Sequence, residues 1–187
     1  MFRLLFAATL AAPLALPVVA DEIGADFSLT STDGRRIGPE QLRGKPYLLF
    51  FGFTHCPEVC PVTLSELSMR LEELGPDSDR LVPIFVTVDP ARDTPEFLRE
   101  YLGFFDTRII GLAGTEAETQ TAARSFRATY RKVPLKDGGY TMDHTAVTYL
   151  MDAQGRFFDR IDYRDDPATQ LRALKRLLND DLQAAYP

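Results

Sequence analysis

The chain lacks an excess of positive charge. It carries 21 lysine and arginine residues against 27 aspartate and glutamate residues, a formal net charge of −6 over 187 residues. An acidic chain has no general electrostatic attraction for phosphate backbones. We therefore expect no nucleic-acid partner, and the function must be sought in particular residues.

Internal repeats, low-complexity runs and linker-like stretches are also missing. Hydrophobic residues make up 45% of the chain, which does not indicate disorder. The length beyond the first twenty residues is sufficient for one domain with a substantial core. We predict a single domain over residues 21–187.

No apolar run clearly reaches the roughly 20 residues that a membrane span needs. The longest run lies within residues 1–20, where Arg3 precedes apolar residues and small residues lead to Ala20. This order is typical of a cleaved secretory signal peptide. The leader thus predicts export, to the periplasm in a bacterium, and an uncleaved membrane anchor is the less favoured alternative.

The apolar pattern predicts an α/β fold. Continuous apolar runs indicate buried strands at 47–53 and 80–88, and helical spacing follows at 62–74. Asp33-Gly34 predicts the turn of an N-terminal hairpin. The chain closes with a strand at 146–151, a second strand and an amphipathic helix. This order predicts a thioredoxin-like fold with an N-terminal β-hairpin extension, its mainly parallel sheet covered by helices on both faces.

Two threonines mark the expected starts of later helices. Thr94 precedes "PEFLREYL" and Thr115 precedes "EAETQTAARS". A threonine hydroxyl at the N-cap can accept a hydrogen bond from the first turn of a helix. We therefore expect a helix directly after each of them.

Cysteine is scarce: the chain has only Cys56 and Cys60, and three residues separate them. Cys56 follows the strand at 47–53, and Cys60 lies just before the predicted helix at 62–74. A helical turn between them would place both thiols on one face, at the strand-end edge where α/β sheets bind ligands. The nearby helix N-terminus should favour the thiolate form.

Three interpretations of the cysteine pair remain open at this point. A structural disulfide would close too short a loop to stabilise a domain of this size much. A thioredoxin-type redox pair normally has two intervening residues rather than three. A metal site needs at least one further ligand.

Histidine is equally scarce, so the search for a third ligand is short. His144 lies just before the strand at 146–151, in a loop that faces the cysteine loop in a thioredoxin-like layout. His55 is the rival, but adjacent side chains such as those of His55 and Cys56 tend to point apart. Two thiolates and an imidazole form a soft donor set that suits Cu(I), or Cu(II) with an added ligand. Zn²⁺ with an open fourth position is the chemical competitor.

Three segments carry a resemblance to a known family. "FTHCPEVCPVT", "VTVDPARDTPEFLREY" and "MDHTAVTYLMDAQGRF" resemble the signatures of the Sco/SenC family, over residues 24–180. These are exported copper proteins that assist assembly of cytochrome c oxidase. The resemblance implies a thioredoxin-like fold and copper bound by Cys56, Cys60 and His144. It also implies two partners, the copper-site subunit of the oxidase and a periplasmic copper donor.

Two acidic residues are candidates for supporting the site. Asp89 ends the strand at 80–88, and Asp143 directly precedes His144. Our hypothesis is that one of these carboxylates orients the His144 ring or tunes the site. We expect Arg92 and Asp93 to fix the shape of their loop.

The sequence therefore predicts an exported copper metallochaperone that delivers copper to the dinuclear copper centre of cytochrome c oxidase. The alternatives are a thiol–disulfide oxidoreductase, with Cys56 and Cys60 as its redox pair, and a copper or redox sensor. Thioredoxin-type reductases carry a cis-proline before the strand that faces their cysteines. The corresponding stretch here, "HTAVTY", has no proline. The absence of this proline favours a copper site over a general thiol–disulfide reductase.

Overall fold

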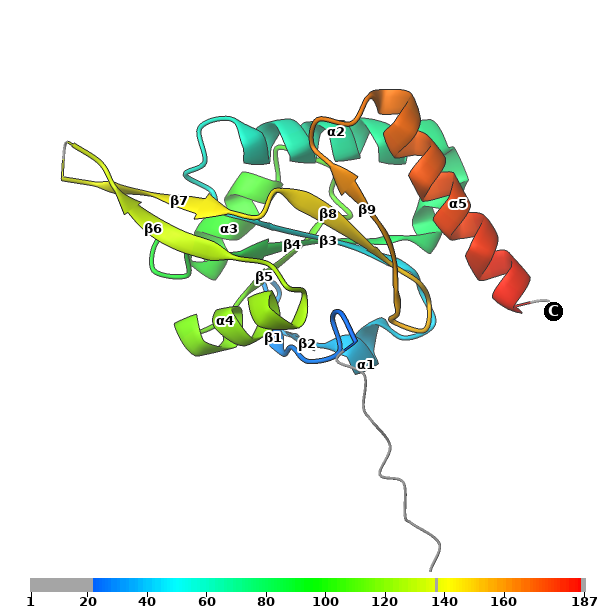
Figure 1. The fold of residues 1–187 in the computed structure, drawn as a ribbon, viewed down its shortest axis with the longest axis horizontal. Coiled ribbons are helices and arrows are strands. Elements are labelled where there is room, and N and C mark those ends of the chain that lie inside the picture. The colour runs from blue at the N-terminus through cyan, green and yellow to red at the C-terminus, as the bar shows by residue number, and fades with distance from the viewer. Residues whose placement is uncertain (1–21, 137, 186–187) are drawn as a thin grey trace, which may run out of the picture.

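A seven-stranded mixed sheet forms the centre of the protein, with the order β2-β1-β5-β4-β3-β8-β9 (Figure 1). The computed structural model describes residues 22–136 and 138–185, so the predicted leader lies outside the described residues. The strands are β1 Leu29–Ser31, β2 Arg36–Ile37, β3 Tyr47–Gly52, β4 Val82–Thr87, β5 Ile110–Ala113, β6 Tyr130–Pro134, β7 Tyr140–His144, β8 Val147–Met151 and β9 Phe157–Asp162.

Five α-helices and one 3₁₀ helix are found among the described residues. They are α1 Pro39–Leu42, α2 Val59–Leu74, η1 Gly75–Arg80, α3 Pro95–Leu102, α4 Glu116–Ser125 and α5 Pro167–Ala185. Thr94 caps α3 by accepting from the backbone N–H of Phe97, and Thr115 caps α4 in a capping box with Glu118. Both predicted helix starts are confirmed. None of the described helices is long and apolar enough to cross a membrane.

Strand β3 is the central strand of the fold. It pairs in parallel with β4 on one side and antiparallel with β8 on the other. Every residue of β3 is buried, which explains why its sequence is a continuous apolar run rather than an alternating one. The expected strand at 47–53 is confirmed to within one residue.

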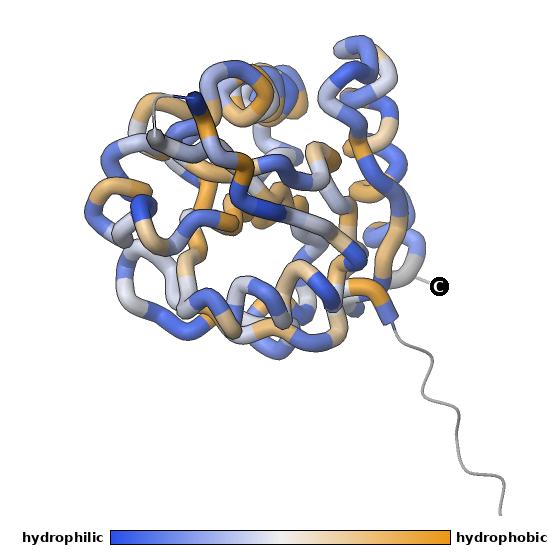
Figure 2. Tube along the Cα trace, turned by 60° about the vertical axis from the view of Figure 1, so that its left-hand side comes forward, coloured by the Kyte–Doolittle hydropathy of each residue, from blue (hydrophilic) through white to orange (hydrophobic). Residues whose placement is uncertain are grey.

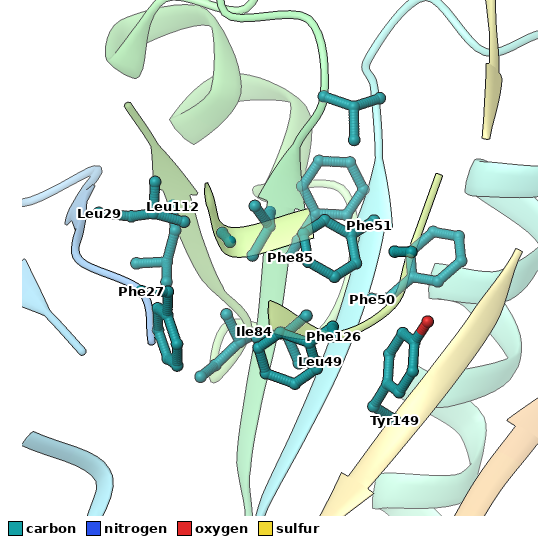
Figure 3. Close-up of a cluster of buried hydrophobic side chains, with 14 of the residues drawn as sticks. Phe27, Leu29, Leu49, Phe50, Phe51, Ile84, Phe85, Leu112, Phe126 and Tyr149 are labelled. Carbon is teal, nitrogen blue, oxygen red and sulfur yellow. The ribbon is translucent and has the colours of Figure 1, made fainter. Parts of the chain in front are cut away.

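The sheet separates two packed layers. On one face Leu48 of β3 lies in a cluster with leucines of α2 and α5, and Figure 1 shows these two helices side by side over the sheet. On the other face Phe51 packs against Phe126, at the end of α4, and Tyr149 of β8 (Figure 3). Along the helices, hydrophobic positions alternate with hydrophilic ones, as expected for helices that cover a sheet with one side and face solvent with the other (Figure 2).

The connections define a thioredoxin-like fold. Helix α2 links parallel strands β3 and β4, the antiparallel pair β8–β9 extends the sheet on the far side of β3, and α5 closes the chain. Strands β1 and β2 form the predicted N-terminal hairpin, in which Gly34 adopts a φ of +89° at the turn. The hairpin joins the sheet through antiparallel pairing of β1 with β5.

One strand was not expected from the sequence. His144 is the last residue of β7, which pairs antiparallel with β6 in a separate two-stranded ribbon rather than lying in a loop. This β6–β7 ribbon projects beyond the main sheet (Figure 1). Most of its residues are exposed or half-buried, so it lacks the apolar alternation by which a strand is recognised.

The Phe126 side chain should be a large contributor to stability. Its ring lies 5.7, 5.6 and 5.2 Å from those of Phe27, Phe51 and Tyr149, and the residue is 1% exposed. We expect Phe126→Ala to lower the free energy of unfolding by about 3–5 kcal/mol, measured by denaturant titration, because the change leaves a cavity.

The matched control is Phe104→Ala, since Phe104 is 81% exposed. That change should stay within about 0.5 kcal/mol of wild type. Equal effects of the two substitutions would show that the cluster of Figure 3 does not form the core.

Candidate metal centre

The two sulfurs meet at the N-terminus of α2. The helix begins at Val59, three residues before the predicted start, so Cys60 lies in its first turn. The Cys60 backbone N–H donates to the Sγ of Cys56 over 3.3 Å. The Glu58 side chain makes no capping hydrogen bond, and the Cys56 sulfur thus accepts from an amide that the helix itself leaves unpaired.

A glycine makes room for the inner sulfur. A Cβ at Gly52, the last residue of β3, would lie 2.6 Å from the Phe85 ring and 3.0 Å from the Sγ of Cys60. The close approach of helix to strand therefore requires a residue without a side chain at this position. Cys60 is fully buried as a result, whereas Cys56 is partly exposed.

His144 completes a three-residue cluster with the two cysteines. Its Nε2 lies 3.5 Å from the Sγ of Cys60. The ligand atoms of Cys56, Cys60 and His144 all lie within 4.8 Å of one another, and no other group of this kind occurs among the described residues. The structure thus brings together the three residues that the sequence analysis selected.

The His144 ring is oriented by a backbone carbonyl. Its Nδ1 lies 3.0 Å from the carbonyl oxygen of Thr145. A carbonyl can only accept, so Nδ1 carries the proton and Nε2 presents its lone pair to the sulfurs. The rings of Phe50 and Phe53 stand edge-on to the imidazole, with centroids 6.0 and 5.7 Å away. They cover part of the ring, and His144 remains partly exposed.

Neither of the proposed carboxylates supplies that contact. Asp143 accepts from the exposed Arg131 guanidinium over 2.8 Å, because strand alternation turns Asp143 away from its neighbour His144. Asp89 is buried and accepts from the Tyr140 hydroxyl over 3.0 Å. The acceptor at Nδ1 could not be predicted from the sequence, because every residue type carries a backbone oxygen.

Asp89 acts instead on the position of the ribbon. It also accepts from the Nε of Arg92, and Arg92 donates from Nη1 to the Tyr140 carbonyl over 3.0 Å. The guanidinium lies 3.8 Å from the centroid of the Tyr140 ring, a cation–π contact. These contacts hold the first residue of β7 to the loop after β4, and His144 is the last residue of the same strand.

His55 lies outside the cluster. Its side chain is 44% exposed, and its ring packs against that of Phe97, on α3, at 5.6 Å. The structure therefore agrees with the expectation that His55 is a neighbour of the cysteine pair rather than its third partner.

The two thiols differ in acidity. A hydrogen bond from Cys60 is the main reason that the pKa of Cys56 falls to about 4, with the Cys60 backbone N–H adding to the effect against partial burial. The same hydrogen bond, together with burial and the charge of Cys56, raises the pKa of Cys60. The metal-free pair therefore holds one proton on Cys60 over the neutral range.

The fold and site together define a class of protein. A thioredoxin-like scaffold here carries two sulfurs and a pre-oriented imidazole nitrogen at the end of its central strand. Thiolate and imidazole donors in a three-membered set are typical ligands of soft metal ions such as Cu(I).

Comparisons with known proteins identify the family. A family model described as SCO1/SenC matches residues 17–179, and the chain belongs to this family. The structure of ScoI from Bradyrhizobium japonicum with copper bound is 46% identical, with a TM-score of 0.76 over 83% of this chain and 99% of that one.

Two curated relatives are similar along most of this chain. The SCO1 homolog 1 of Arabidopsis thaliana mitochondria is 41% identical over 72% of this chain. A SCO2-like protein of Rickettsia felis is 35% identical over 82% of it. The aligned region spans 41% of the Arabidopsis protein and 76% of the Rickettsia protein.

The difference in acidity predicts selective alkylation. In reduced, metal-free protein we expect iodoacetamide to label Cys56 at about pH 6, well below the usual thiol pKa of about 8.5, because the reagent attacks the thiolate. Labelling should fall as the pH drops toward the Cys56 pKa of about 4. Peptide mass spectrometry across a pH series gives the profile.

Cys60→Ala provides the control. It removes the main hydrogen bond to the Cys56 sulfur, so the labelling midpoint of Cys56 should move to higher pH. An unchanged midpoint in this variant would show that Cys60 does not stabilise the thiolate.

Proposed function

We propose that this protein is a copper metallochaperone. It binds one copper ion through the thiolates of Cys56 and Cys60 and the neutral imidazole of His144. It then delivers the ion to the dinuclear copper centre of cytochrome c oxidase during assembly. The observation that carries the proposal is the convergence of these three side chains within 4.8 Å.

The donor set supports copper over other ions. Two thiolates and one imidazole suit Cu(I), and a further ligand would accommodate Cu(II). A structure of a 46% identical relative holds copper. The Thr145 carbonyl orients the His144 ring, so that Nε2 already faces the sulfurs before a metal ion binds.

The exposure of the ligands supports delivery. Cys60 is fully buried, whereas Cys56 is partly exposed. A three-ligand site with one accessible sulfur allows a donor atom of a partner to enter before the resident ligands leave. The partners we propose are a periplasmic copper donor and the copper-site subunit of the oxidase, in keeping with the family role in oxidase assembly.

We also propose that the protein is exported to a periplasm, with residues 1–20 removed and residues 21–187 acting as one copper-binding domain. The basic, apolar and small-residue order of the leader supports export. An N-terminal anchor is the less favoured form of the same placement.

The acidity of Cys56 favours a second candidate, a thiol–disulfide oxidoreductase that keeps the copper-site cysteines of the oxidase reduced. A partly exposed thiolate next to a buried thiol is the arrangement that such an enzyme uses for attack and resolution. In that case His144 would be dispensable, and Cys56 and Cys60 would cycle.

Copper titration with two histidine variants tests the main proposal. Wild type should bind one Cu(I) tightly under anaerobic conditions. His144→Ala removes a direct ligand, so its affinity should fall by more than the roughly 10–100-fold typical of losing an outer-sphere partner. His55→Ala is the matched control and should keep near-wild-type affinity, because His55 is outside the cluster. Competition with a chromophoric Cu(I) chelator measures all three.

The cellular readout separates the two candidates. Cells that carry His144→Ala should fail to assemble active oxidase if copper delivery is the function. Normal assembly with this variant, together with failure of both cysteine variants, would instead establish the reductase. Failure of the wild-type protein to bind copper tightly would also contradict the proposal that it is a copper chaperone.

A further inference from the structure

Two of the three residues of the candidate centre, Cys56 and His144, are partly exposed. Cys60 is fully buried and His144 is flanked by the rings of Phe50 and Phe53. Cys56 is partly exposed, and the residue next to it, His55, has 44% of its side chain exposed. One route by which an incoming ligand can reach the centre therefore passes Cys56 and its neighbour in the sequence, His55.

The proton on His55 is placed by a relay of hydrogen bonds. The Thr54 hydroxyl donates to the Oδ1 of Asp93 over 2.6 Å, and a carboxylate oxygen can only accept. The same hydroxyl lies 3.0 Å from the Nδ1 of His55, so its oxygen accepts there and Nδ1 carries the proton. The Nε2 of His55 thus carries a free lone pair, as does that of His144.

The last group in this chain of hydrogen bonds is the buried carboxylate of Asp93. Asp93 is 1% exposed, and it also accepts from the Thr54 backbone N–H over 3.0 Å and from the Thr87 hydroxyl over 2.5 Å. Hydrogen-bonded carboxylates commonly orient metal-binding histidines from behind. Here a carboxylate acts through a hydroxyl on an exposed imidazole, and the Phe97 ring supports that imidazole at 5.6 Å.

We propose that His55 is a transfer ligand for copper, which it holds through Nε2 together with Cys56 while the ion enters or leaves. The proposal rests on the proposed copper-chaperone function. His55 takes no part in the resting site. The Cα atoms of adjacent residues are about 3.8 Å apart, so the proposal requires a rotation of the Cys56 side chain that brings its sulfur toward the His55 ring.

The step is a ligand exchange without electron transfer. As copper leaves, its bond to the Nε2 of His144 breaks and a bond to the Nε2 of His55 forms, while the bond to Cys56 persists. The bond to Cys60 is then replaced by one to a thiolate of the acceptor, and the bonds to His55 and Cys56 are replaced last by bonds to further ligands of the acceptor. Cys60 takes up the proton that the acceptor thiol gives up, and Cu(I) keeps its oxidation state throughout.

The test separates transfer rate from equilibrium affinity. Full-length Cu(I)-loaded protein is mixed anaerobically with excess bathocuproine disulfonate in a stopped-flow instrument, and the chelator complex is followed by absorbance. His55→Leu should slow the transfer by about tenfold or more. The reason is that the transition state for transfer then lacks the bond between copper and His55, which raises the activation free energy. Its equilibrium affinity for Cu(I) should stay within about threefold of wild type, a difference of under 1 kcal/mol.

His55→Met is the matched rescue variant. Methionine and leucine have similar sizes, but only the thioether can bind Cu(I). We expect His55→Met to restore most of the rate that His55→Leu loses. Thr54→Val keeps the shape of the relay and removes its hydroxyl, so it should slow transfer to a smaller extent than His55→Leu.

Each remaining outcome overturns the inference. Equal rates for wild type and His55→Leu would show that His55 takes no part in transfer. Equally slow Leu and Met variants would show a role in packing rather than ligation. A tenfold loss of equilibrium affinity in His55→Leu would place His55 in the resting site. If wild type binds no copper, the proposed function itself fails, which the affinity measurement reveals first.

Discussion

The junction between the central strand and the helix that follows it is the constraint on which the site depends. Strand β3 is buried along its whole length, and α2 starts so close to its end that only glycine fits at position 52. The Cys60 amide donates to the Cys56 sulfur at this junction. Helix start, sulfur spacing and thiolate character therefore arise from a single packing arrangement, and a shift of α2 would change all three.

The third residue of the cluster, His144, is held in place by different contacts. His144 comes from a ribbon outside the main sheet, whose first β7 residue is tied to the loop after β4 by Asp89 and Arg92. A site assembled from two separately supported elements can change the distance between histidine and sulfurs without disturbing the core.

Much of this arrangement was predictable from the sequence, for identifiable reasons. The apolar run at 47–53, the caps at Thr94 and Thr115, and the scarcity of cysteine and histidine all carry local signals. The ribbon strand β7 was missed because it is half-exposed and lacks an apolar period. The Thr145 carbonyl that orients His144 was missed because main-chain acceptors leave no trace in residue type. Asp143 was a candidate by adjacency, yet strand alternation turns it toward Arg131.

The two histidines show how placement decides chemistry for one residue type. Each has its Nδ1 proton placed by an acceptor, a carbonyl for His144 and a threonine hydroxyl for His55, so each offers Nε2. The His144 ring lies 3.5 Å from the Cys60 sulfur and edge-on to two phenylalanines, whereas the His55 ring, on the residue before Cys56, is exposed and packs against Phe97. The His144 ring stands within reach of both sulfurs, whereas the His55 ring lies outside the cluster. Retention and exchange, which oppose each other at a single site, can in this way be assigned to different imidazoles.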